Sequence, residues 1–181
     1  MNTSYQLKKY HYVLYQIVIR EVKQRYRGTF LGYIWTLINP VLMMITISLV
    51  FSTIFNLDFK SYFLFIFSGL IGFNLFSTIV SQCSLSLISN EQLIKNVYIP
   101  KIIFPLSTSI TFFIDSLIFF ISIYLVLLLS DAKLTIEILF LPVSFILTFL
   151  FSFGLSLIVS VASVFFRDLT HILTIIFQIL I

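Results

Sequence analysis

Charged residues, cysteine and histidine are all scarce in this sequence. Only 10% of the 181 residues are charged and 60% are hydrophobic, whereas an average soluble domain has about 25% and 45–50%. A water-soluble core of this size could not hide the apolar surplus. One cysteine and two histidines leave too little material for a disulfide framework or a metal site, so we predict no metal ligand and no catalytic residue.

Phosphate-binding and nucleic-acid-binding signals are missing as well. The five glycines never form the G-x-x-x-x-G-K-[ST] loop, so the chain is not expected to bind ATP or to hold a cofactor of its own. The net charge of +4 would suit nucleic acid only on the basic face of a soluble module, and we expect no nucleic-acid partner. The acids Glu21, Glu91 and Asp168 are isolated, whereas a membrane-embedded transferase needs clustered carboxylates or histidines.

Long apolar runs dominate what is present. A run of about 20 apolar residues crosses the roughly 30 Å hydrocarbon core of a bilayer as a helix. Four runs reach this length: Trp35–Phe55, Tyr62–Gln82, Phe104–Ser130 and Ile138–Val164. A fifth run, Leu169–Ile181, has 13 residues and would reach only about 20 Å. The sequence therefore predicts an all-α polytopic membrane protein with four full spans and part of a fifth, either truncated or completed by further sequence.

The basic residues of the connections predict the orientation. Lys and Arg gather on the cytoplasmic side of membrane proteins. With the N-terminus inside, two bases, Lys60 and Lys133, lie outside and nine lie inside: Lys8, Lys9, Arg20, Lys23, Arg25, Arg27, Lys95, Lys101 and Arg167. Residues 1–30 also lack the apolar stretch of a cleavable signal. We expect a multi-pass protein of the bacterial inner (plasma) membrane with a cytoplasmic N-terminus.

An amphipathic helix is predicted over Tyr5–Gln24, before the first span. Its apolar side carries Leu7, Tyr10, Leu14, Ile17 and Val18, and its polar side carries Lys9, Gln16, Arg20 and Lys23. We expect the apolar stripe to lie in the acyl boundary of the inner leaflet. Residues 1–30 then form a cytoplasmic N-terminus with an interface helix, and residues 31–181 form the transmembrane domain. The alternative, a first helix of a small cytosolic domain, has too few residues to build a core.

Four basic residues precede the first span, followed by Trp35 at the headgroup border. Lys23, Arg25 and Arg27, together with Tyr26, could receive the diphosphate of a lipid carrier, because arginine engages phosphate oxygens bidentately. Anchoring by positive charge on the cytoplasmic side explains the same residues without a substrate.

A short polar segment, Ser89–Lys101, connects the second and third spans. Ser89 and Gln92 fit a capping box, and Pro100 is expected to end the helix. Glu91 near the start and Lys95 near the end suit the helix dipole. A helix of this kind is either a docking element or a tight connection.

Two further polar features lie in or beside the spans. Arg167 and Asp168 form a cytoplasmic hinge between the fourth and fifth apolar runs and could pair with each other or with another loop. Asp115 lies inside the third span, where a bare carboxylate costs on the order of 2.5–3.5 kcal/mol. Hydroxyls on its face or beside it could partner it: Thr108, Thr111, Ser116 and Ser122. Its role is a helix–helix anchor, a pore-lining group or a proton-coupling site.

Four motifs in register resemble one known family. They are Arg25-Tyr-Arg-Gly-Thr-Phe-Leu-Gly-Tyr-Ile-Trp through Asn39-Pro40, Ser68-Gly-Leu, Asn90-Glu-Gln-Leu-Ile-Lys-Asn-Val-Tyr-Ile-Pro100, and Arg167-Asp168. In this order and spacing the chain, from about residue 15 to its end, is similar to the ABC-2 type permeases that export O-antigen, teichoic acid and related polysaccharides.

The resemblance implies a partnership. It implies six membrane helices per subunit, a homodimer, a lipid-linked glycan as substrate, and a coupling helix that docks into a separate ABC ATPase, which would hold ATP and magnesium. Residues 89–101 fall on the coupling-helix position, and the residues implied there are Asn90, Glu91, Gln92, Leu93, Lys95, Tyr98 and Pro100. The rest of the fifth helix, a re-entrant part and the sixth helix are absent from this sequence.

Two other functions compete with an exporter permease. An ion-coupled secondary transporter would need several intramembrane ionisable residues and repeated halves, whereas one acid and no clear repeat are found. A non-functional remnant of an exporter gene would have the same motifs, and the DNA beyond codon 181 would identify it.

Overall fold

A computed structural model describes residues 3–26, 34–56, 58–129 and 140–180 of the chain. Seven helices occupy these ranges: α1 (Thr3–Tyr26), α2 (Ile34–Phe55), α3 (Phe59–Ser89), α4 (Glu91–Asn96), α5 (Ile103–Leu129), α6 (Phe140–Phe165) and α7 (Leu169–Leu180). The all-helical prediction is confirmed. Within the described residues, three helices have stretches long and apolar enough to cross a membrane: Tyr62–Ser89, Ile103–Ile121 and Phe140–Phe165. The apolar stretches Val41–Phe55 and Leu169–Leu180 are shorter.

α3 is longer than the sequence predicts, because it continues from the expected end at Gln82 to Ser89. Its last two turns contain residues that are polar in sequence but buried in the fold, including Ser84 and Ser86. Their hydroxyls donate to the backbone carbonyls of Ser81 and Cys83, so the helix itself satisfies these polar groups. Hydropathy alone therefore places the end of the helix too early.

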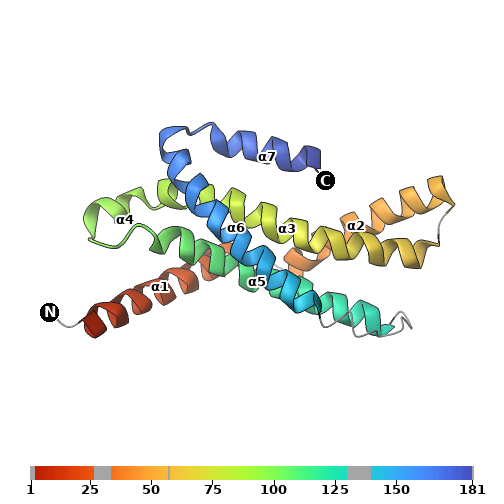
Figure 1. Cartoon of the computed structure of the whole chain (residues 1–181), viewed down its shortest axis with the longest axis horizontal. Helices are drawn as coiled ribbons and strands as arrows, with labels where there is room; N and C mark the ends of the chain where they lie inside the picture. The colour runs from red at the N-terminus through yellow and green to blue at the C-terminus, as the bar shows by residue number, and fades with distance from the viewer. Residues whose placement is uncertain (1–2, 27–33, 57, 130–139, 181) are drawn as a thin grey trace.

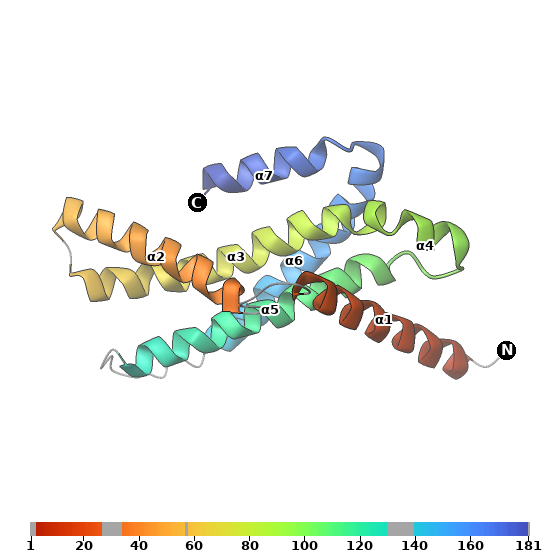
Figure 2. The ribbon, with the colours of Figure 1, turned by 180° about the vertical axis from the view of Figure 1, so that it is seen from behind.

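α3 lies at the centre of the molecule and packs against α2, α5, α6 and α7. α4 and the turn between α6 and α7 lie at one end, and the connection from α2 to α3 lies at the other, as the front and back views show (Figure 1, Figure 2). The end that holds α4 and this turn carries Lys95, Lys101 and Arg167, and we call it the basic end. The fold thus brings the basic loops together, and their cytoplasmic location stays a prediction.

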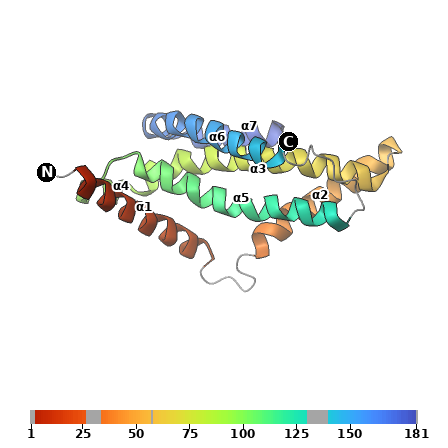
Figure 3. The ribbon, with the colours of Figure 1, turned by 60° about the horizontal axis from the view of Figure 1, so that its bottom comes forward.

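Small residues let α6 pack closely on α3, which it crosses in Figure 3. Ser152, Ser156 and Ser160 recur every four residues on α6, and all three are fully buried. Each hydroxyl donates to a backbone carbonyl three or four residues earlier in the same helix. Close approach through small side chains is the usual means of helix association in lipid. We call these three residues the serine ridge.

Phenylalanine rings pack between α5 and α6, before the serine ridge begins on α6. The Phe113 ring lies 5.3 Å from Phe145 and 4.3 Å from Phe149, between centroids. Other large apolar side chains of α6 point outward, such as Phe151 and Ile158, which are 66% and 69% exposed. An apolar interior with an equally apolar exterior is what a lipid solvent permits.

The apolar stripe of α1 packs in part against α5, and its expected place in the acyl boundary of the inner leaflet stays a prediction. Ile17 is buried with Ile103 and Phe104 of α5, and Tyr10 and Leu14 pack on the same cluster. The side chain of Leu7 lies outside the described residues. Periodicity identifies the buried face of a helix but not the element that covers it, and here the start of α5 covers it.

Candidate functional site

An ion pair joins the end of α1 to the middle of α5. Nη1 of Arg25 donates to Oδ2 of Asp115. The guanidinium carbon of Arg25 also lies 3.7 Å from the centroid of the Phe112 ring, at a distance typical of a cation–π contact. Phe112 and Asp115 are three residues apart, so they share one face of α5. A carboxylate inside a candidate membrane span thus meets a cation from a helix that precedes the spans.

This pair corrects the partners expected for Asp115. Thr108 and Thr111 direct their hydroxyls to a different acid, and Ser116 donates to the backbone carbonyl of Phe112. The side chain of Ser122 lies outside the described residues. A cation 90 positions away cannot be inferred from helical spacing, although the high energy of a buried bare carboxylate correctly predicts that a partner exists.

Glu21 forms the second contact of α1 with α5, one helical turn before Arg25. Its carboxylate accepts hydrogen bonds from Thr108 and Thr111, both at 3.2 Å, and from Ser107 at 3.5 Å. Burial raises the pKa of the Glu21 carboxyl, and the hydroxyls of Thr111 and Thr108 lower it in part. Glu21 is an isolated acid in the sequence, although its spacing of four from Arg25 already places both on one face of a helix.

Glu21→Gln is expected to stabilise the fold at neutral pH, raising the midpoint of thermal unfolding by about 2–4 °C. Because the pKa of Glu21 is raised, its neutral form favours the folded state at pH values below the unfolded pKa, and this stability is lost as the pH rises through the folded pKa. Glutamine keeps an oxygen acceptor for the threonines without the charge. Thermal unfolding of both proteins between pH 4 and pH 8 tests this, and an equal midpoint for the two at every pH would contradict it.

A third contact ties α1 to the junction of α3 and α4. Nη2 of Arg20 donates to Oδ1 of Asn90 at 2.9 Å, and Nδ2 of Asn90 donates to the backbone carbonyl of Ser86 at 2.9 Å. Asn90 is buried, with 6% of its surface exposed. Its side chain is therefore held on both sides.

The predicted capping box of Ser89 and Gln92 is wrong, because Ser89 belongs to the end of α3 and Asn90 precedes α4. Asn90 occupies the N-cap of α4 without a side-chain cap, and the hydroxyl of Ser89 turns back to the carbonyl of Leu85. Because α3 continues to Ser89, this serine ends one helix instead of starting the next. α4 also ends at Asn96, before Pro100, with Val97 extended. β-branched residues and the position before a proline favour extended backbone.

These contacts surround a cavity of about 490 Å³, which we call the α1 cavity. Its walls come from α1, α3, the α3–α4 junction and α5. They are formed by Arg20, Glu21, Gln24, Arg25, Gln82, Leu85, Ser86, Ser89, Asn90, Thr108 and Phe112. Small-molecule sites span about 300–1,000 Å³, and the volume of this cavity falls in that range.

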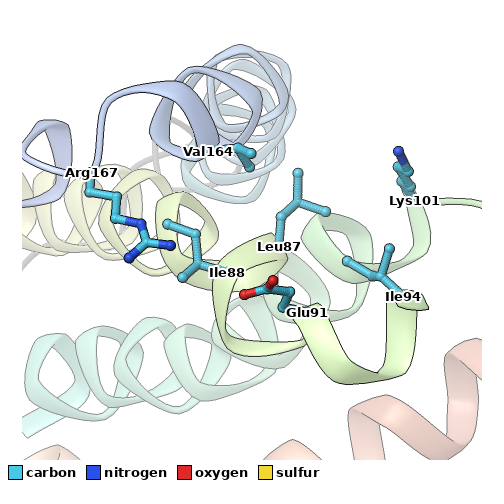
Figure 4. Close-up of a pocket in the computed structure, with 7 residues that line it drawn as sticks. All are labelled: Leu87, Ile88, Glu91, Ile94, Lys101, Val164 and Arg167. Carbon is cyan, nitrogen blue, oxygen red and sulfur yellow. The ribbon is translucent and has the colours of Figure 1, made fainter. Parts of the chain in front are cut away.

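A smaller pocket of about 230 Å³ opens beside α4 at the basic end (Figure 4). Glu91 and Arg167 reach it from α4 and from the α6–α7 turn. A hydrogen bond from Lys95 at 2.5 Å lowers the pKa of Glu91, and the charge of Arg167 contributes in the same direction. Both hinge residues are exposed, and the Asp168 carbonyl accepts from the amides of His171 and Ile172 in the first turn of α7.

The remaining coupling residues divide between the surface and the core. Gln92, Lys95 and Tyr98 are exposed, with Tyr98 at 94%, whereas Leu93 packs on the cluster that includes Ile17. α4 thus presents a polar outer side and is fixed by an apolar inner side, and Tyr98 lies exposed just after its end.

The predicted entry residues are less completely described. Lys23 is exposed on α1, and Arg25 is held by Asp115 and Phe112. Tyr26 ends α1, but its side chain, all of Arg27 and the side chain of Trp35 lie outside the described residues. Three of the five residues therefore lie at the end of α1, and the side chains of two of them are described.

The profile of the ABC-2 type transporter family matches residues 12–181, which include the ion pair, the α1 cavity and α4. This chain belongs to the ABC-2 type transporter family. The O-antigen export system permease protein RfbA of Myxococcus xanthus is 32% identical to this ABC-2 chain over 172 residues, which cover 93% of the chain and 65% of the relative. A protein of the same name from Klebsiella pneumoniae is 29% identical over 161 residues, which cover 87% and 61%. The ABC-2 chain thus spans less than two thirds of the length of these curated relatives.

Proposed function

We propose that this chain acts in the membrane permease of an ATP-driven exporter that moves lipid-linked polysaccharide across the bacterial inner membrane. The observation that carries the proposal is the match to the ABC-2 type transporter family over residues 12–181. The names of the relatives, O-antigen export system permeases, support a polysaccharide as the cargo. The chain itself would catalyse no reaction, and ATP and magnesium would be held by an ABC ATPase partner.

α4 is the proposed docking element for this ATPase. It is short and lies at the basic end, where the side chain of Lys95 is 70% exposed and Tyr98, two residues after the end of α4, is 94% exposed. Its inner face is anchored through Leu93 and Ile94 to the cluster of α1 and α5. Movement of a docked ATPase would therefore reach α1 and α5 through packed side chains, and two permease copies would shift between inward and outward access.

The lipid-linked glycan would enter beside the end of α1. Lys23 is exposed there and Arg25 is fixed by its contacts with α5. With Tyr26, Arg27 and Trp35 these residues are the proposed receiving group for the carrier diphosphate, because guanidinium and ammonium groups bind phosphate through charge-assisted hydrogen bonds.

Co-purification of an ABC ATPase with the permease tests the proposal. We expect a stable complex of two permeases and two ATPases whose ATP hydrolysis rises several-fold with an undecaprenyl diphosphate-linked glycan. Tyr98→Ala combined with Lys95→Ala is expected to reduce co-purification at least tenfold. Lys60→Ala, at the opposite end of α3 and also exposed, serves as the control with no effect. Absence of any ATPase partner would favour the ion-coupled transporter instead.

A further inference from the structure

The α1 cavity has walls suited to a hydroxylated ligand. Besides Arg20 and Arg25, the lining includes the amides of Gln24, Gln82 and Asn90. Ser86, Ser89 and Thr108 also line it, with their hydroxyls donating within the fold to Cys83, Leu85 and Glu21, so that their oxygens remain as acceptors. Amides and hydroxyls both donate and accept hydrogen bonds, which is what a sugar needs from its site. The smaller pocket beside α4 is below the volume range of small-molecule sites.

Both guanidiniums that line the cavity are held in place by residues of other helices. Arg25 is fixed by Asp115 and by the Phe112 ring of α5. The contact with Asp115 uses the Nη1 end of the group, and a guanidinium carries five N–H donors in a rigid fork. The pair thus orients Arg25 while it also lines the cavity.

Arg20 is fixed in the same manner, by an asparagine that is itself held by a backbone carbonyl. Asn90 accepts from Arg20 and donates to Ser86. Groups that are already immobilised lose less entropy when a ligand binds. The two arginines are five positions apart on α1, so one helix supplies both cationic groups.

The charge of the lining favours an anion. The lining holds two positively charged groups, the guanidiniums of Arg20 and Arg25, and one negatively charged group, the carboxylate of Glu21. The oxygens of Glu21 are already engaged by Thr108 and Thr111 of α5, and Asp115 is not part of the cavity lining. An anion placed between Arg20 and Arg25 would therefore meet two donors of charge-assisted hydrogen bonds.

We infer that the α1 cavity binds a sugar phosphate. The phosphate lies on the forks of Arg20 and Arg25, and the sugar hydroxyls meet the amides and hydroxyls of α1 and α3. Asn90 and Asp115 are positioning residues, since they act on the ligand through the two arginines. The choice of a sugar among hydroxylated groups rests on the proposed export function, whereas the preference for a phosphate follows from the cavity.

Binding of glucose 1-phosphate to the purified protein in phosphatidylcholine nanodiscs tests the inference. We expect saturable binding by calorimetry, at least tenfold tighter than that of glucose or of inorganic phosphate. Arg25→Lys and Arg20→Lys keep the charge but lose the fork, and each should weaken binding about tenfold. Lys60→Gln removes an exposed cation at the far end of α3 that does not line the cavity, and this control should bind as the unsubstituted protein does.

Variants of Asn90 separate an effect on ligand binding from an effect on stability. Asn90→Ala should weaken glucose 1-phosphate binding, and Asn90→Gln, which keeps an amide oxygen for Arg20 and adds no charge, should restore it. Restored binding with an unrestored thermal midpoint would separate positioning from stability. Equal losses in both variants would contradict the positioning role.

Two further outcomes would overturn the inference. If Lys60→Gln weakens binding as much as the arginine variants do, then the overall positive charge of the protein attracts the anion. If inorganic phosphate binds as tightly as the sugar phosphate, then the cavity selects no sugar. A polyprenyl diphosphate-linked sugar placed in the nanodisc shows whether the bilayer or the aqueous phase supplies the ligand. The assay needs no ATPase, so an absent ATPase partner would defeat the export function and leave this result standing.

Discussion

Arg25→Ala is expected to destabilise the protein by about 3–5 kcal/mol, because it removes a guanidinium that pairs with a buried carboxylate. Asp115 has 9% of its side chain exposed and lies in a candidate membrane span, whereas the side chain of Arg25 is 29% exposed and borders the α1 cavity. An arginine that loses its partner can reach water there, but an aspartate cannot. Asp115→Asn should therefore destabilise less than Arg25→Ala.

Thermal unfolding of the detergent-solubilised protein measures this difference, with an expected fall in midpoint on the order of 10 °C for Arg25→Ala. Lys23→Ala, on the exposed side of the same helix, is the matched control and should change stability by no more than about 0.5 kcal/mol. The double variant Arg25→Met with Asp115→Leu should recover most of the loss, since a buried ion pair can be replaced by apolar groups of similar volume. Equal midpoints for Arg25→Ala and Lys23→Ala would show that the pair does not hold α1 to α5.

The ion pair of Arg25 with Asp115 shows what the sequence can and cannot predict. Run length and hydropathy predict the apolar helices to within a few residues at most ends, because lipid imposes the composition of any helix it surrounds. The acid at position 115 predicts a partner, since a bare charge in a span is unstable. The identity of that partner depends on how α1 packs against α5. Arg25 and Asp115 are 90 positions apart, so no local sequence pattern connects them.

Errors at the α3–α4 junction have a related cause. Ser89 and Gln92 satisfy the spacing of a capping box, and local rules alone favour that interpretation. In the structure, Asn90 accepts a hydrogen bond from Arg20 and donates one to the carbonyl of Ser86, and α3 continues to Ser89. Sequence reasoning also missed Glu21, Phe112 and the glutamines of the α1 cavity, since each becomes meaningful only when α1, α3 and α5 meet.

The serine ridge should be the second most sensitive feature of the fold. Ser156→Leu combined with Ser160→Leu places two branched side chains where α6 lies close to α3, and overpacking costs about 1–3 kcal/mol at each site. The sum, about 2–6 kcal/mol, is comparable to the total stability of many proteins. We expect a large loss of folded protein in detergent, measured by size-exclusion chromatography and by the thermal midpoint.

The control for this prediction lies on the opposite face of the same helix. Ile158 is 69% exposed, so Ile158→Leu changes side-chain shape where lipid can adjust, and the midpoint should stay within about 1 °C. Ser156→Ala with Ser160→Ala keeps the small volume but removes the hydroxyls, which donate to the backbone carbonyls of Phe153 and Leu157 in their own helix. If close approach is what the ridge provides, the alanine pair should be nearly neutral and the leucine pair should not. A large loss with alanine would instead assign the ridge a hydrogen-bonding role between the helices.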